Sequence, residues 1–237
     1  DATVTEILEE EGSLSCIITP NDGSGPVKTR AGQILMAIGR RPDVSRLLGK
    51  DISLDMKDGK IAVDSDFETS EPGVYAIGDV AARTQLAHVA AAQGTYVVEK
   101  IAGRPHSIKL EVVPNGMFVS LPIVPNCIYT DPEIATVGIT EEIAKKYGLK
   151  VRCGHFSMRD NGKSIITGEE HGFIRLLFEA YSNTIVGAQM MCPRATDMIG
   201  EIATAIANGL TAQEMSFAMR AQPTYNEGIG AAIEDAM

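Results

Sequence analysis

Three features that are common in redox and nucleotide-binding proteins are absent from this sequence. It has no Gly-x-Gly-x-x-Gly turn, so it carries no dinucleotide pyrophosphate loop of that kind. It has no closely spaced pair of cysteines, which excludes a local redox disulfide and the common zinc-ligand spacings. It has no apolar run of membrane-spanning length, and its first residues show no basic segment followed by an apolar one.

Charge and cysteine usage narrow the classes of partner. The chain has 21 lysines and arginines against 31 aspartates and glutamates, a net charge of −10. This balance disfavours nucleic acid and anionic membranes as partners. The four cysteines are scattered, which favours reduced, mostly buried thiols in a cytoplasmic protein with no metal site: Cys16, Cys127, Cys153 and Cys192.

The first half of the chain contains short apolar runs and one long helical segment. Residues 3–30 alternate between apolar and polar and predict two antiparallel strands joined by a turn. The runs Leu35–Ile38 and Val74–Ile77 predict buried strands, each followed by a glycine. Small residues along one side of 85–101 predict a helix that packs closely on a sheet or a ligand.

The second half has the pattern of a separate domain. Prolines punctuate the chain around a connector at 106–120 and predict a change of domain. Beyond it, strands are expected at 127–130, 150–157, 172–180 and 185–191, and helices at 140–148, 196–208 and 212–219. This order predicts a compact α+β interface domain, an antiparallel sheet with helices on one face.

The most informative segment is Thr69–Asp79, whose apolar run ends in Gly78 and Asp79. Ligands of open α/β sheets bind beyond the carboxyl ends of the strands. A glycine there allows close approach of a ligand, and the carboxylate of Asp79 can accept hydrogen bonds from ligand hydroxyls. The pattern therefore predicts a nucleotide site, and the alternative is an ordinary Gly-Asp turn.

Four segments, taken in order, carry a resemblance to a known family: 34–43 (apolar residues, then Gly-Arg-Arg-Pro-Asp), Thr69–Asp79, Leu86–Gly94 and Tyr129–Gly138. They resemble the FAD-dependent pyridine nucleotide-disulfide oxidoreductases, the family of dihydrolipoamide dehydrogenase, glutathione reductase and mercuric reductase. The resemblance covers nearly the whole chain and is closest to dihydrolipoamide dehydrogenase. It implies an α/β part that belongs to FAD/NAD(P)-binding domains, followed by an α+β dimerisation domain.

The resemblance also assigns domains. It implies the end of the NAD-binding domain at 1–33, the C-terminal segment of the FAD-binding domain at 34–112, and the dimerisation domain at 113–237. Because both dinucleotide turns and the redox cysteines of the family are absent, we expect the chain to be the C-terminal part of a longer enzyme. The preceding FAD and NAD domains would be partners that this chain lacks.

Specific cofactor contacts follow from the same resemblance. Asp79, on the turn with Gly78, would bind a ribityl hydroxyl of FAD. Ala87 and His88 would lie against the flavin at the start of the helix, and Gly39 would allow the NAD to approach. The alternative for Gly39 is a turn glycine beside two surface arginines. We expect this chain to be inactive alone and to hold no FAD.

The segment 221–227, Ala-Gln-Pro-Thr-Tyr-Asn-Glu, resembles the family's His-Pro-Thr-x-x-Glu active-site motif. Glu227 matches the acid that orients the histidine, but Gln222 stands where the acid/base histidine is expected. A glutamine amide forms hydrogen bonds and carries no proton near neutral pH. The protein is then a divergent disulfide reductase, or it reduces an acceptor that needs no base here, or the residue was introduced by substitution. The alternative is a non-catalytic loop before a C-terminal helix.

The resemblance therefore implies electron transfer between NAD(H), FAD and a dithiol/disulfide by a homodimer formed through 113–237. The resemblance also implies a lipoyl-bearing protein as a partner of such an enzyme. Two alternatives stay open: a dimerisation module without catalysis, and a related flavoenzyme such as a transhydrogenase. Mercuric reductase is disfavoured because the chain ends at Met237 without that branch's C-terminal cysteine pair.

Overall fold

A computed structural model describes residues 1–44, 47–49, 52–82, 84–112 and 121–237. The chain divides into two compact units, Asp1–Asp43 and Val44–Met237. Within the part of the chain that the structure describes, no helix combines the length and apolar character needed to cross a bilayer.

The first unit is a three-stranded antiparallel sheet in the order β1-β2-β3. Its strands are β1 (Ala2–Glu10), β2 (Ser13–Pro20) and β3 (Val27–Ala31). The predicted strand pair within 3–30 is confirmed, and Glu10 pairs with Ser13 across the turn. Sequence analysis missed β3 because it is short and mostly exposed, so little hydrophobic alternation marks it.

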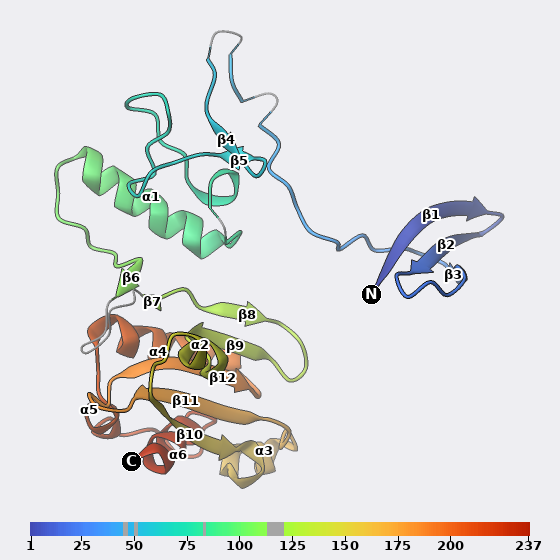
Figure 1. Ribbon diagram of the computed structural model, residues 1–237. Coiled ribbons are helices and arrows are strands. Elements are labelled where there is room, and N and C mark those ends of the chain that lie inside the picture. The colour runs from blue at the N-terminus through green and yellow to red at the C-terminus, as the bar shows by residue number, and fades with distance from the viewer. Residues whose placement is uncertain (45–46, 50–51, 83, 113–120) are drawn as a thin grey trace. The chain divides into compact units, whose positions relative to one another are not determined.

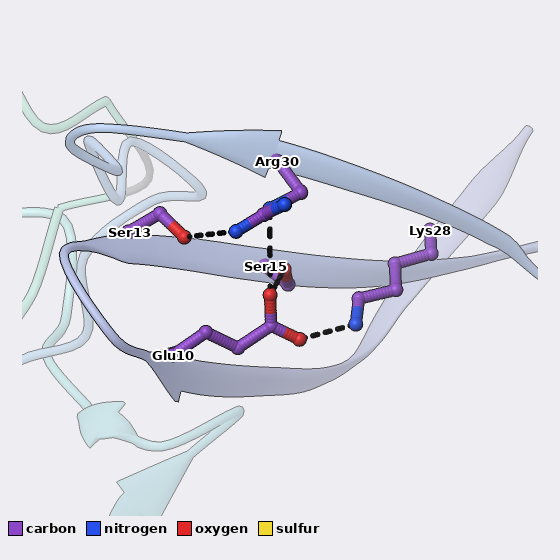
Figure 2. A network of polar contacts seen from close by, with 5 residues as sticks. All are labelled: Glu10, Ser13, Ser15, Lys28 and Arg30. Carbon is purple, nitrogen blue, oxygen red and sulfur yellow. Dashed lines mark hydrogen bonds and ion pairs between the residues drawn. The ribbon is translucent and has the colours of Figure 1, made fainter.

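A polar network ties the three strands of this sheet together (Figure 2). The Glu10 carboxylate accepts hydrogen bonds from Lys28 on β3 and from Ser15 Oγ on β2, the latter at 3.0 Å. Arg30 Nε lies 3.4 Å from the same carboxylate, and Arg30 Nη2 donates to Ser13 Oγ at 2.9 Å. The hydrogen bonds from Lys28 and Ser15 lower the pKa of Glu10 below its usual value.

The buried strand predicted at Leu35–Ile38 is wrong. These residues form no strand, and Leu35 and Ile38 are 90% and 88% exposed. An apolar strand is stabilised by neighbouring strands that pair its backbone and cover its side chains. Among the described residues, none pairs with this segment.

The second unit begins with short strands and one long helix. Its first elements are β4 (Met56–Lys57), β5 (Lys60–Ile61), the 3₁₀ helix η1 (Gly78–Val80) and α1 (Ala87–Ile101). The expected helix at 85–101 is confirmed, and the spacing of its buried residues, Val89, Gln93 and Val97, places them on one face. In this part of the unit, Leu54, Ile61 and Ala76 pack together as a small hydrophobic core.

The prediction of a buried strand over Val74–Ile77 is also wrong. Only a single bridge forms, between Tyr75 and Glu68, and Val74 is exposed. Two backbone hydrogen bonds, Thr69 N to Val74 O at 2.8 Å and Ala76 N to Phe67 O at 3.0 Å, fold the segment back on itself. The chain therefore reaches Gly78 from a tight local turn rather than from a strand in a sheet.

A five-stranded antiparallel sheet forms the centre of the second half (Figure 1). Its order is β10-β11-β12-β9-β8, and the two-stranded ladder of β6 (Glu111–Val112) and β7 (Leu121–Pro122) precedes it in the sequence. The strands are β8 (Asn126–Ile128), β9 (Ile134–Gly138), β10 (Val151–Ser157), β11 (Phe173–Glu179) and β12 (Ile185–Met191). All four strands expected in this half are confirmed, and β9 lies within the Tyr129–Gly138 segment.

Helices cover both faces of this sheet. They are α2 (Glu141–Lys146), η2 (Met158–Asp160), α3 (Gly162–Thr167), α4 (Ala195–Asn208), α5 (Ala212–Ser216) and α6 (Glu227–Ala236). Leu176 and Phe178 face the large core that includes α4 and α6, whereas Leu177 packs in a second cluster with Ala144 of α2. The expectation of helices on one face is therefore wrong, because alternate residues of β11 are apolar on both sides.

Side-chain caps fix the helix ends in this half. Thr140 accepts a hydrogen bond from Ile143 N at the start of α2, and Thr211 forms a capping box with Glu214 at the start of α5. Gly209 ends α4 at a φ of 65°. The carboxylate of Glu133 reaches α4 from beside β9 and accepts hydrogen bonds from Thr196 N and Oγ1, at 2.9 and 2.6 Å.

All four cysteines are free thiols. Cys192 is fully buried, and burial raises its pKa to about 12. The other three are only half-buried, so the expectation of mostly buried thiols holds for one of the four.

We predict that Glu10→Gln destabilises the three-stranded sheet and weakens the pH dependence of its stability. The lowered pKa means that the ionised carboxylate stabilises the folded sheet above the unfolded-state pKa, and that this stabilisation is lost as pH falls through the folded-state pKa. Amide exchange of β1–β3 between neutral and acidic pH measures the effect. Glu6→Gln, on an exposed position of the same strand, is the control; equal pH profiles for the two variants would contradict the prediction.

Candidate functional site

The Gly78–Asp79 turn lies directly against α1. Gly78 is buried at a φ of 66°, and a Cβ added there would lie 2.8 Å from Ala90 Cβ. Its N–H donates to Oε1 of Gln93 at 2.8 Å. The turn thus depends on glycine for both its backbone conformation and its close approach to the helix.

Gln93 is a site residue that sequence analysis missed. Its side chain is only 8% exposed, and its amide oxygen satisfies the buried backbone donor of Gly78. The available signal was one polar residue among the small and apolar residues of Leu86–Gly94. A buried polar side chain in such a segment has to find a partner, and here the partner is the turn itself.

Asp79 follows this glycine in η1 and is partly exposed. Within the described part of the chain, no donor hydrogen-bonds its carboxylate. The backbone around it is held by hydrogen bonds from Ala81 N and Ala82 N to Gly78 O, at 3.0 and 2.7 Å. The geometry therefore presents a carboxylate acceptor on a fixed turn at the side of α1.

Ala87 and His88 begin α1 and are both exposed. The ring Nε2 of His88 lies 2.9 Å from Pro125 O, so the imidazole contacts the chain that leads into β8. His88 also lines a cavity of about 430 Å³ with Thr84 and residues of the connector. These two residues are thus on the helix against which the Gly78–Asp79 turn packs.

Gly39 lies in the other compact unit. It has a φ of 115°, which favours glycine, and an added Cβ would meet no atom within 4 Å. Its backbone conformation, rather than crowding, therefore accounts for the glycine. Its approach to a nicotinamide cofactor stays a prediction.

The second candidate site is the loop between α5 and α6, which carries Gln222. Gln222 is exposed, and Glu227 begins α6. The Glu227 carboxylate accepts a hydrogen bond from Thr224 N at 2.8 Å, and Thr224 Oγ1 donates to Ala221 O at 2.6 Å. Glu227 therefore fastens the loop backbone to the first turn of α6.

Neighbouring elements add further contacts to this loop. Asn161 Nδ2 donates to Thr224 O at 3.1 Å. The Tyr225 hydroxyl hydrogen-bonds to Glu169 and lies 2.9 Å from Thr167 Oγ1. Burial and the hydrogen bond to Glu169 raise the pKa of Tyr225, so its hydroxyl stays protonated at neutral pH.

Two cavities adjoin this loop. One, of about 410 Å³, is lined by Glu227, Arg220 and residues of α6 and η2. The other, of about 430 Å³, is lined by Pro223, Thr224 and residues of α4. Among the described residues, no hydrogen bond joins this loop to the Gly78–Asp79 turn, and no group of histidine, cysteine, aspartate and glutamate side chains is arranged to hold a metal ion.

Both halves of the chain match models of one protein family. The model of the pyridine nucleotide-disulphide oxidoreductase family matches residues 1–94, and the model of its dimerisation domain matches residues 124–233. Dihydrolipoyl dehydrogenase from Geobacillus stearothermophilus is 35% identical over 208 residues, 87% of this chain and 42% of that protein. The enzyme of the same name from Rhizobium etli is 32% identical over 235 residues, 99% of this chain and 47% of that protein.

Solved structures share the fold. LpdA from Mycobacterium tuberculosis matches the whole chain with a TM-score of 0.86 at 24% identity, over 48% of its own length. The HOCl-induced flavoprotein disulfide reductase RclA from Escherichia coli matches 99% of the chain with a TM-score of 0.80 at 17% identity, over 50% of its own length. The chain thus spans about half the length of the proteins it matches, and the expected fold class is confirmed.

We predict that Gly78→Ala destabilises the turn and the start of α1 more than Gly73→Ala does. Both glycines have positive φ, so each alanine costs roughly 1–2 kcal/mol in backbone strain. Only at Gly78 does the new methyl group meet Ala90, which adds about 1–3 kcal/mol of overpacking. Amide exchange across α1 measures the difference, and equal losses in the two variants would show that the close contact is unimportant.

Proposed function

The chain belongs to the pyridine nucleotide-disulphide oxidoreductase family, and we propose that it supplies one wall of the FAD site and the dimer interface of a dihydrolipoamide dehydrogenase-like enzyme. That enzyme would transfer electrons between NAD(H), FAD and a dithiol/disulfide. The observation that carries the proposal is the Gly78–Asp79 turn, held against α1 by the hydrogen bond from Gly78 N to Gln93.

The residues of this turn fit a flavin nucleotide. Bound FAD would supply the two-electron redox chemistry, and the chain would supply binding and orientation. Asp79 would accept a hydrogen bond from a ribityl hydroxyl, because its carboxylate is partly exposed on a rigid turn. Ala87 and His88 would lie against the flavin at the start of α1, and Gly39 would allow the NAD to approach.

We further propose the domain division expected from the sequence, with NAD-domain residues at 1–33, FAD-domain residues at 34–112 and the dimerisation domain at 113–237. The match of the dimerisation-domain model to 124–233 supports the last of these. The first compact unit extends to Asp43, ten residues beyond the first proposed boundary (43 − 33 = 10).

Gln222 and Glu227 would occupy the acid/base position of a partner subunit's active site. Glutamine cannot carry a proton there, so Gln222 would position the redox sulfurs or the acceptor by hydrogen bonding. Glu227 already accepts a hydrogen bond from Thr224 N, which supports a role in shaping the loop. The acceptor would then be one whose reduction needs no base on this side, or a disulfide that is reduced slowly.

A second candidate function is a dimerisation module without catalysis. It is favoured by the core of the second half, in which side chains of β9–β12, α4 and α6 pack on one another. Sedimentation of the whole chain in the absence of FAD and NADH tests the association that both functions require. A monomer at micromolar concentration would contradict both.

Enzyme assays separate the two functions. We expect the 237-residue chain alone to show neither flavin absorbance nor NADH-dependent reduction of lipoamide, because it has no Gly-x-Gly-x-x-Gly turn and no paired cysteines. A longer protein that joins this chain to dinucleotide-binding segments with the glycine-rich turns and the cysteine pair should bind flavin and oxidise NADH. Turnover by the chain alone would contradict the proposed division of labour, and a flavin-free longer protein would favour the dimerisation module.

We predict that Gln222→His in the flavin-containing enzyme accelerates lipoamide reduction by about 10²-fold, the lower end of the gain from general acid–base catalysis. The gain should follow a group that titrates near the histidine value of about 6.5. Stopped-flow measurement of the dithiol half-reaction between acidic and neutral pH checks this. Gln222→Asn, which has no titrating group, is the control, and an equal rate for both variants would exclude Gln222 from the acid/base position.

A further inference from the structure

Glu201 on α4 contacts the residues on both sides of the loop that carries Gln222. Its Oε1 accepts a hydrogen bond from Arg220 Nη2 at 2.6 Å, and its Oε2 accepts one from Asn226 Nδ2 at 3.0 Å. Arg220 directly precedes the loop 221–225 and Asn226 directly follows it. One carboxylate therefore joins both ends of the loop to the middle of one helix.

The Arg220 side of this contact is largely removed from water. Its side chain is 11% exposed, and that of Glu201 is 32% exposed. Arg220 Nη1 also donates to Ala218 O at 3.2 Å, and its guanidinium packs against Gly230 of α6. A guanidinium this buried depends on an anionic partner, and among the described residues Glu201 is the carboxylate that ion-pairs with it.

The interior of the loop is organised separately. Thr224 bonds to Ala221 and Glu227, and Asn161 bonds to Thr224. These contacts give the loop its shape and join Thr224 to Asn161, and Tyr225 packs on the core that includes α4. Among the described residues, the hydrogen bonds that connect the loop to α4 are those at its two ends. The Glu201 carboxylate supplies the connection to α4 at both ends.

We propose that Glu201 is a positioning residue that holds the Gln222 loop in register with α4. The structural part of this inference stands on the two hydrogen bonds alone. Its consequence for catalysis rests on the proposed function, in which Gln222 faces the reacting groups of a partner subunit. Glu201 acts through Arg220 and Asn226 and touches no reacting atom.

Hydrogen exchange of the 237-residue chain tests the structural part. The reporters are the amides of Thr224 and Gly228, which donate within the loop and its junction with α6. Glu201→Gln removes the charge and turns one acceptor into a donor. We expect exchange at these amides to be about 10- to 100-fold faster, the factor that follows from losing a charge-assisted hydrogen bond.

Asp197→Asn is the matched control. It makes the same change of charge on the same helix, but Asp197 pairs with Arg194 at the exposed start of α4, 3.2 Å away. We expect exchange in the loop to be unchanged in this variant. Asn226→Ala, which removes only one of the two contacts, should give an intermediate rate and serves if Glu201→Gln does not fold.

Steady-state kinetics of the flavin-containing enzyme test the catalytic consequence. Glu201→Gln should lower kcat for lipoamide by about 10- to 100-fold, the cost of a misplaced active-site group. The rate at which NADH reduces the flavin should not change, because that step does not use the proposed acid/base position. Loss of folded enzyme would instead lower the rates of flavin reduction and lipoamide reduction equally.

The two assays test the two parts of the inference independently. Unchanged exchange at Thr224 and Gly228 in both Glu201→Gln and Asn226→Ala overturns the positioning role, whatever the activity. Faster exchange with no lipoamide reduction by the unmodified enzyme supports the positioning role and refutes the proposed function.

Discussion

The double burial of the central antiparallel sheet is the constraint on which the rest of the second half depends. Leu176 and Phe178 on β11 point into the core with α4 and α6, while Leu177 points to α2. Gly154 on β10 has no room for a Cβ, which would lie 1.8 Å from Ala232 O of α6. This close contact places α6 directly on the sheet, and α6 begins at Glu227, so the packing of the sheet determines where the Gln222 loop ends.

The two candidate sites are built by different means. The Gly78–Asp79 turn depends on close backbone approach, with Gly78 against Ala90 and its N–H bonded to Gln93. The Gln222 loop depends on side-chain contacts from three elements, through Glu227, Asn161 and the carboxylate of Glu201. The contacts of the turn come from one helix that follows it within 15 residues of the chain, whereas those of the loop come from segments up to 63 residues away.

Elements with strong local signals were predictable from the sequence. The helices expected at 140–148, 196–208 and 212–219 and the strands β11 and β12 are present. The caps at Thr140, Thr211 and Gly209 that bound these helices are short-range chemistry. The apolar run Leu35–Ile38 has an equally clear signal and forms no strand. The apolar pattern shows only that these residues could be buried in a sheet. Burial also requires neighbouring strands, and none of the described residues pairs with this segment.

The sequence by itself determined the family, because the family pattern depends on residue identity in ordered local segments. The same segments are the source of the predictions for Asp79 and Gln222. Only the tertiary structure revealed Gln93 as the partner of Gly78 and Glu201 as the partner of Arg220 and Asn226. These pairs are 15, 19 and 25 residues apart. Their hydrogen bonds depend on which helix faces which loop, and that is decided by packing rather than by any local pattern.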